Sequence, residues 1–207
     1  MKLHWSPRSP FVRKVMIVAH EVGIVDRLDC VRSVAAMTKP HLELMQDNPL
    51  SKIPTLVRDD GIVLYDSRVI CEYFDTLHSG HKLFPAEPQA RFTALRRQAL
   101  GDGMLDFLIL WRGEGDRAHK SEAHLSSFAA KRAATLASLE TESGALSDSS
   151  FSIGHIAVGC ALSYLDFRFS AQPWRGDHPK LAAWHATFAA RPSAKATEAV
   201  DDSHIKP

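Results

Sequence analysis

Pro54 stands directly before a short run of residues that favour β-strands, Thr55–Val57. Because proline has no backbone N–H to contribute to a sheet, it belongs at the first residue or at the edge of a strand, where a cis peptide bond is a common arrangement. A cis Ile53–Pro54 bond reverses the chain just before the strand and leaves the N–H and C=O of Ile53 available to an extended ligand backbone. The sequence therefore predicts a strand that begins at a binding loop, with a small peptide as the natural ligand.

The first 78 residues alternate between strand and helix patterns. Two strand candidates flank an amphipathic helix that Gly23 ends, so we expect a βαβ unit with parallel strands and a right-handed crossover. Asp60-Gly61 between two apolar runs is a hairpin signal. The expected fold is a small α/β domain of order βαβαββα with a mixed four-stranded sheet. The predicted strands are 2–5, 28–31, 55–57 and 62–64, and the predicted helices are 11–22, 41–45 and 66–77.

The character of the chain changes between Ser79 and Pro88, a polar segment that Gly80, Pro85 and Pro88 punctuate. Beyond it we find only helical periodicity. We therefore expect a domain at 1–78, a linker at 79–88 and an all-helical domain at 89–207. The predicted helices are 90–111, 119–139, 153–169 and 180–190, with connecting loops at 113–115 and 142–150.

Composition excludes several kinds of partner. The 25 basic and 24 acidic residues give a net charge of +1, so no field attracts nucleic acid or an anionic membrane, and neither is expected as a partner. The apolar tract Ile153–Leu165 is shorter than the roughly 20 residues that a membrane helix needs. Three widely separated cysteines indicate reduced thiols, and the first residues show no signal-peptide pattern, so a cytoplasmic location is expected.

The 11 histidines show no metal-ligand spacing. His20-Glu21 lacks the second histidine of an H-E-x-x-H motif, and His119 and His124 are five residues apart. No P-loop and no G-x-G-x-x-G motif follows a predicted strand. The sequence therefore predicts neither a metal nor a nucleotide cofactor.

Four motifs, in this order and at these spacings, resemble the soluble glutathione transferase family, and the resemblance covers nearly the whole chain. The sequence Ser-Pro-Phe-Val-Arg-Lys in the first motif is most similar to that of bacterial and plant serine-type members. The resemblance implies a thioredoxin-like N-terminal domain, a helical second domain, and a homodimer that uses glutathione as cosubstrate against hydrophobic electrophiles, a detoxification reaction. The motifs are Ser6–Val15, Asn48–Leu56, Tyr65–Ser67 and Arg191–Ser193.

The resemblance implies that Ser9 is the catalytic residue, because the family places a Ser, Tyr or Cys at this turn to hold the glutathione sulfur. The alternative is that Ser9 only caps a helix that starts at Pro10, which is worth about 1 kcal/mol. The two roles are compatible, since a hydroxyl accepts from a backbone N–H and still donates its own hydrogen to a thiolate. The positive end of the helix dipole also favours the thiolate.

The resemblance also assigns the glutathione-binding residues. At the start of a helix, Asp66 would face the γ-glutamyl ammonium and Ser67 would bind the carboxylate, or the pair would only cap the helix. Lys52, or Lys39 with a poorer placement, would meet the glycyl carboxylate or be a solvated lysine. The further implied residues are Phe11, Ile53, Pro54 and, toward a neighbouring subunit, Asp102, for which a local turn or a surface charge is the simpler account.

The electrophile pocket is expected to draw on the first loop and the first long helix, although plain core packing is an alternative for most of its members. The sequence leaves two rival functions open: a non-catalytic binding or regulatory protein, and another glutathione-dependent reaction such as isomerisation, peroxide reduction, dehalogenation or ether cleavage. These reactions differ in the pocket lining. The implied pocket residues are Trp5, Arg8, Met104, Phe107 and Trp111.

Ser152 is the expected N-cap of the most apolar helix, with Phe151 and Ile156 as a hydrophobic staple. The family usually has Asp at the position that His155 holds here. We therefore expect the reciprocal capping bond to be weakened or made differently.

Overall fold

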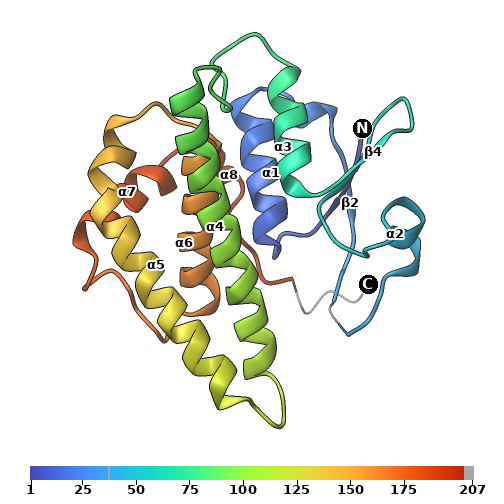
Figure 1. Ribbon diagram of the computed structural model, residues 1–207. Coiled ribbons are helices and arrows are strands. Elements are labelled where there is room, and N and C mark those ends of the chain that lie inside the picture. The colour runs from blue at the N-terminus through green and yellow to red at the C-terminus, as the bar shows by residue number, and fades with distance from the viewer. Residues whose placement is uncertain (37, 203–207) are drawn as a thin grey trace. The chain divides into compact units, whose positions relative to one another are not determined.

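The computed structural model describes residues 1–36 and 38–202. They divide into two compact units (Figure 1): Met1–Ala86 with the segment from Pro192 onward, and Glu87–Arg191. The first unit is an α/β fold and the second is all-helical, which confirms the predicted fold class.

The first unit is built on a mixed four-stranded sheet of order β2-β1-β3-β4. β1 runs parallel to β2 and antiparallel to β3, and β3 pairs antiparallel with β4, which confirms the expected βαβ unit and hairpin. Gly61 in the hairpin turn has a φ of +83°, a conformation that glycine adopts without steric cost. The strands are β1 (Lys2–Trp5), β2 (Asp29–Arg32), β3 (Thr55–Val57) and β4 (Val63–Leu64).

The strand register brings four chain segments to one edge of this sheet. Trp5 at the end of β1 pairs with Arg32 at the end of β2, and His4 pairs with Thr55 at the start of β3. β4 runs back alongside β3 and ends at Leu64. The segments that follow β2, β1 and β4 therefore leave the sheet at the edge where the chain enters β3.

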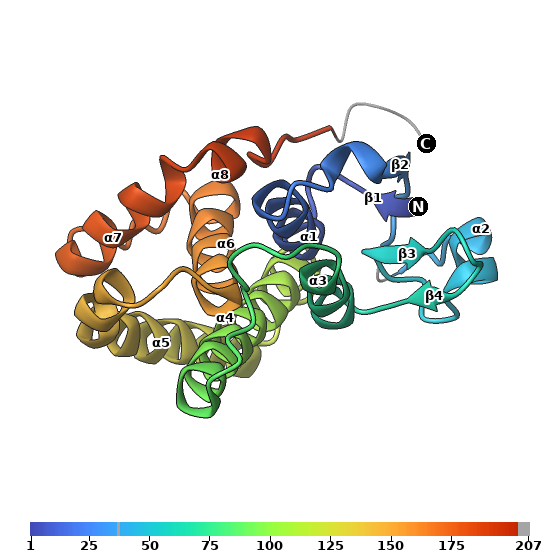
Figure 2. The same cartoon turned by 90° about the horizontal axis from the view of Figure 1, so that it is seen from above.

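Helices cover both sides of the sheet in the first unit. α1 (Pro10–Glu21) and α3 (Ser67–Thr76) pack against each other on one side, and α2 (Leu42–Asp47) lies on the other (Figure 2). Gly23, at a φ of +73°, ends α1 as predicted, and a short 3₁₀ turn at Val25–Arg27, which the sequence analysis did not predict, leads into β2.

A short helix, α8 (Pro192–Ala196), packs against α1. The Arg13 guanidinium donates to the carbonyl of Ala194 at 3.2 Å, and the Ser193 hydroxyl donates to Glu21. This segment was predicted to belong to the helical domain at 89–207, whereas the contacts group its described part from Pro192 onward with the first unit. The reason is pairing between residues 181 positions apart, which no local pattern reveals.

The second unit consists of four helices, of which α6 is buried along most of its length. α6 packs against α4, and the two helices approach closely where Gly101 faces Ala157 and where Gly154 faces Ala94. Within the described ranges, no helix combines the length and the apolar composition that a membrane span requires. The helices are α4 (Pro88–Gly115), α5 (Glu122–Asp148), α6 (Ile153–Arg168) and α7 (Pro179–Ala189).

Two predicted loops are helical, so those predictions were wrong. α4 continues through 113–115, and α5 continues through 142–148. Both segments are polar or glycine-rich, but their polar groups have partners: Glu142 accepts from Arg97 at 2.7 Å, and Glu114 accepts from the backbone of Ser121 at 2.6 Å. Tertiary bonds therefore override weak helix propensity here.

Candidate functional site

Ser9 ends the turn that follows β1 and caps α1. Its backbone N–H donates to the carbonyl of Ser6 at 3.2 Å, and its Oγ accepts from the N–H of Val12 at 3.3 Å. Pro10 occupies the first helical position, where its missing N–H costs nothing. Because the hydroxyl accepts this cap bond, its own hydrogen can still be donated to an anion in front of the helix.

Pro54 enters β3 through a cis Ile53–Pro54 peptide bond. The preceding loop is braced by Asn48, whose amide donates to the Lys52 carbonyl at 3.2 Å and to the Thr55 hydroxyl at 2.8 Å. Within 1–36 and 38–202, the backbone of Ile53 has no hydrogen-bond partner. A backbone donor and acceptor are thus presented at the sheet edge.

Asn48 lies within the second sequence motif, but its bracing role was not predicted. The available signal was a polar residue directly before Pro49, at the junction of a helix and a strand. Asn48 is 1% exposed, so its bonds stabilise the loop from inside the fold.

Asp66 and Ser67 begin α3 at the same edge. The Asp66 carboxylate accepts from the N–H of Arg68 at 2.9 Å through Oδ1, so it is an N-cap, and it is exposed to solvent. Ser67 is the first helical residue and is buried. The Tyr65–Asp66 peptide bond is also cis.

The remaining predicted site residues divide between the two units. In the first unit, Lys52 and Lys39 are exposed, and Phe11 is half-buried with the Lys14 ammonium 5.6 Å from its ring centre. Trp5 and Arg8 flank the turn after β1, and Arg8 forms an ion pair with Asp202 at 2.6 Å. The structure thus places the loops carrying Ser9, Ile53–Pro54, Asp66–Ser67, Trp5, Arg8 and Lys52 at one sheet edge.

The other predicted residues lie on α4 in the second unit. Asp102 is inside the helix and 1% exposed, which makes both the local-turn and the surface-charge accounts wrong. Met104 is buried, and Phe107 is half-buried. The Trp111 ring lies 6.2 Å from the Phe128 ring and 5.3 Å from the Phe169 ring, so it packs against aromatic side chains of this unit.

The two halves of the chain match models of the two domains of one family. Residues 8–77 match the N-terminal domain of glutathione S-transferase, and residues 122–187 match its C-terminal domain. The chain belongs to the glutathione S-transferase family.

Relatives that match this chain over nearly their whole length support this assignment. The uncharacterized GST-like protein YibF of Escherichia coli K12 is 32% identical over 202 residues, which cover 96% of this chain and 98% of YibF. A glutathione transferase family member from Pseudomonas fluorescens Pf-5, solved with bound glutathione, is 43% identical with a TM-score of 0.92, covering 96% of this chain and 98% of its own. A second structure from that organism, with bound S-(propanoic acid)-glutathione, is 41% identical with a TM-score of 0.89 and covers 96% and 99%.

The structure also holds two Ser-His-Asp clusters that the predicted glutathione site does not use, and the first is structural. His4 bonds the Ser33 hydroxyl at 2.8 Å through Nδ1 and Asp47 at 2.7 Å through Nε2. Hydrogen bonds from Lys2 and His4 lower the pKa of Asp47. Ser33 is 1% exposed, so no substrate reaches it, and the cluster ties the end of α2 to β1.

The second cluster consists of Ser163, His185 and Asp166 in the second unit. It holds its histidine in the wrong tautomer for catalysis. Arg175 donates to Nδ1 of His185 at 3.1 Å, so that nitrogen accepts. Nε2 of the neutral ring then carries the proton and donates to the Ser163 hydroxyl at 3.0 Å. A general base needs an unprotonated nitrogen facing the serine, so this network serves packing.

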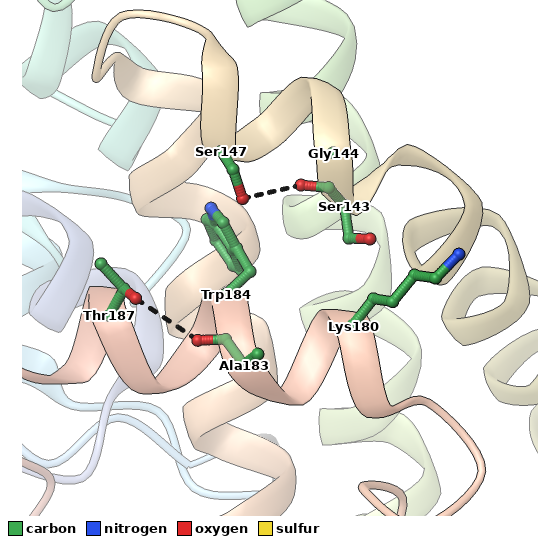
Figure 3. Close-up of a pocket in the computed structure, with 7 residues that line it drawn as sticks. All are labelled: Ser143, Gly144, Ser147, Lys180, Ala183, Trp184 and Thr187. Atoms are coloured by element: carbon green, nitrogen blue, oxygen red, sulfur yellow. Dashed lines mark hydrogen bonds between the residues drawn. The ribbon is translucent and has the colours of Figure 1, made fainter.

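A shallow groove of about 380 Å³ lies between α5 and α7 in the second unit (Figure 3). Its hydroxyls bond to their own helices: Ser147 donates to the Ser143 carbonyl at 3.1 Å, and Thr187 to the Ala183 carbonyl at 3.4 Å. Lys180 lies at its rim. Because its hydroxyls bond to the backbone and Lys180 is at the rim, the groove lacks the convergent polar groups of a ligand site.

Metal and thiol chemistry find little support in the described part of the chain. No group of His, Cys, Asp or Glu in residues 1–36 and 38–202 is arranged to hold a metal ion. Cys30, Cys71 and Cys160 are all described and form no disulfide. Burial, and then the charge of Asp29, raise the pKa of the Cys30 thiol, which lowers its reactivity.

Proposed function

We propose that this protein is a glutathione transferase in which Ser9 stabilises the glutathione thiolate for attack on a hydrophobic electrophile. The observation that carries the proposal is the order of loops along one sheet edge: Ser9 after β1, Ile53–Pro54 before β3 and Asp66–Ser67 after β4. As part of the proposal, the enzyme is a cytoplasmic homodimer with a role in detoxification.

The spacing of these loops suits a tripeptide. β1 and β4 are separated by two strand spacings, which is ~10 Å, and an extended tripeptide spans about the same length. The N–H and C=O of Ile53 would pair with the cysteinyl backbone of glutathione, as a strand pairs with an added strand. Asp66 would face the ammonium and Ser67 the carboxylate of the γ-glutamyl end, and Lys52 or Lys39 would meet the glycyl carboxylate.

The contribution of Ser9 to the rate is limited. A thiol with a pKa of about 8.5 is only a few per cent ionised at pH 7, so lowering its pKa by about two units gives roughly 25-fold more thiolate. Nucleophilicity falls with the pKa, and a Brønsted slope of about 0.4 to 0.5 removes roughly 6- to 10-fold of that gain. Positioning of the electrophile must therefore supply most of the acceleration.

The ligands of the relatives support the choice of cosubstrate. One Pseudomonas relative binds glutathione and another structure holds S-(propanoic acid)-glutathione, a conjugate whose sulfur carries a carboxylated chain. We include conjugates of this kind among the products that the site of this protein would release.

The experiment that tests the proposal is the ultraviolet thiolate absorbance of bound glutathione as a function of pH. We expect Ser9→Ala to raise the pKa of bound glutathione by about two units, toward the value of about 8.5 of an ordinary thiol, because the hydroxyl donor is lost. The variant also loses a helix cap, worth about 1 kcal/mol of stability.

Ser121→Ala is the matched control, because Ser121 caps α5 through its own hydroxyl, at 3.4 Å from the His124 N–H. It should lose similar stability and leave the thiolate absorbance unchanged. If Ser9→Ala and the wild type titrate alike, the serine mechanism is wrong. If glutathione at millimolar concentration does not bind, the transferase proposal fails as a whole.

A second prediction concerns the γ-glutamyl end of glutathione. Asp66→Asn should weaken glutathione binding about tenfold in titration calorimetry, because a charge-assisted bond to the ammonium becomes a neutral one. Asparagine caps a helix as well as aspartate does, so the unfolding free energy should change by less than about 0.5 kcal/mol. Asp60→Asn, in the β3–β4 turn at the opposite end of the strands, is the control and should bind like the wild type. Unchanged affinity in Asp66→Asn would leave the residue with capping alone.

A further inference from the structure

Asp202 is held between two arginines in the first unit. Arg8 Nε lies 2.6 Å from Oδ1 of Asp202, and Arg32 Nε lies 2.7 Å from Oδ2. The Asp202 side chain is 6% exposed, whereas each arginine side chain is 25% exposed. One carboxylate is thus sandwiched by two partly accessible guanidinium groups.

This pair of arginines belongs to the β1 and β2 side of the sheet, away from the predicted Ile53 and Asp66 loops. Arg8 directly precedes Ser9, and Arg32 is the last residue of β2, paired with Trp5 at the end of β1. In the order β2-β1-β3-β4, β2 is on one side of β1, while β3 and β4, which carry the Ile53 and Asp66 loops, are on the other. A group on the glutathione sulfur that points away from the Ile53 and Asp66 loops would therefore extend toward the side of the sheet that carries the arginines.

The chemistry of the pair suits a carboxylate. Two guanidinium groups repel each other unless an anion lies between them, and their fixed N–H forks match the planar geometry of a carboxylate. Here the anion is the Asp202 carboxylate. The segment that carries it crosses the turn after β1, where the N–H of Val200 donates to the carbonyl of Pro7 at 3.4 Å. An intramolecular ligand of this kind competes with a bound one at an effective concentration in the millimolar range.

We propose that Arg8 and Arg32 form a subsite for a carboxylate on the electrophile, and that Asp202 fills this subsite as an internal ligand until such a substrate displaces it. The inference rests on the proposed function and narrows its substrate class to small electrophiles whose apolar body ends in a carboxylate. Asp202 thereby sets the specificity of the site by selecting substrates that compete for the two arginines.

The test compares two probes that differ only at the far end of the sulfur substituent, S-(2-carboxyethyl)glutathione and S-propylglutathione, by titration calorimetry. Asp202→Asn removes the internal charge with little change of shape, so it should bind the carboxyethyl probe about fivefold or more tighter than the wild type, with unchanged affinity for the propyl probe. Adding Arg8→Gln to Asp202→Asn should abolish that gain.

Asp60→Asn is the matched control, because Asp60 also partners an arginine, Arg58, at 2.6 Å, but in the β3–β4 turn. It should leave both affinities unchanged. If Asp202→Asn changes both probes by the same factor, or neither, Asp202 only tethers the segment and the subsite is refuted while the transferase proposal stands. If neither probe binds to any variant, the transferase proposal and the subsite both fail.

Discussion

Acidification from pH 7 to pH 4 is expected to remove about 3 kcal/mol of stability through the single side chain of His155. This residue, 3% exposed, makes the reciprocal capping arrangement at the start of α6. Its Nδ1 accepts from the N–H of Ser152 at 3.1 Å, and its Nε2 lies 3.0 Å from the carbonyl of Leu146 and so donates to it. The bond from Ser152 requires a neutral ring, because a protonated Nδ1 cannot accept, whereas Nε2 donates to Leu146 in either protonation state.

The environment of His155 opposes its protonation. Burial first, and the charges of Arg97 and Arg191 with it, lower its pKa from 6.5 to about 4, against the opposing effects of the hydrogen bond to Leu146 and of the charge of Glu142. Since the folded protein binds this proton less readily than the unfolded chain does, stability is fully present above pH 6.5. It is lost as the pH falls from 6.5 to about 4, with about 2 kcal/mol gone by pH 5.

The measurement is urea unfolding at pH 7 and pH 5 for the wild type and for His155→Gln. Glutamine also accepts at this capping position but has no charge to gain, so the variant should lack this loss of stability. Carboxylates that titrate in the same range contribute to both proteins and cancel in the difference. Equal losses in the two proteins between pH 7 and pH 5 would show that His155 is not the responsible group.

Gly101→Ala is expected to destabilise the protein by about 2 kcal/mol or more, because the added carbon overpacks a helix crossing. A Cβ at this position would lie 2.5 Å from the carbonyl carbon and 2.7 Å from the carbonyl oxygen of Ala157, both of them backbone atoms on α6. Backbone atoms cannot rotate away as a side chain does. α4 and α6 would therefore have to separate, which loosens the core of the second unit.

Gly103→Ala supplies the matched control on the same helix. A Cβ at Gly103 meets nothing within 4 Å among the described residues, so the change should stabilise α4 by up to about 1 kcal/mol, the ordinary gain of alanine over glycine. Thermal and urea unfolding of the two variants should therefore shift in opposite directions. A shift of the same sign in both would mean that helix propensity, rather than the close approach of α4 and α6, dominates at Gly101.

Much of the first unit could be predicted because its signals are local. Asp60-Gly61 closes a hairpin, Gly23 ends α1, and Pro10 starts it, each through backbone constraints that act within a few residues. The predictions of two parallel strands and of a hairpin came from the same local signals, whereas the strand order that brings the loops to one edge came only from the structure.

The errors arose where partners are distant in sequence. The end of α5 was predicted to be a loop because the sequence does not show that Glu142 pairs with Arg97, 45 residues away. The capping bond of His155 was expected to be weakened or made differently. In the fold, Nε2 donates to the Leu146 carbonyl, which leaves Nδ1 free of a proton to accept from Ser152. The electrophile pocket stays a prediction, with Trp5 and Arg8 in the first unit and its other members on α4.

The sequence by itself determined the family and the fold class of this protein and predicts its peptide-binding loops, because capping, turn and proline constraints act over a few residues and depend on residue type. Only the tertiary structure decided that Arg8 and Arg32 share Asp202, 170 residues beyond Arg32. The physical reason is that an ion pair depends on which side chains lie close together in space, and neither spacing nor periodicity along the chain predicts this for residues so far apart.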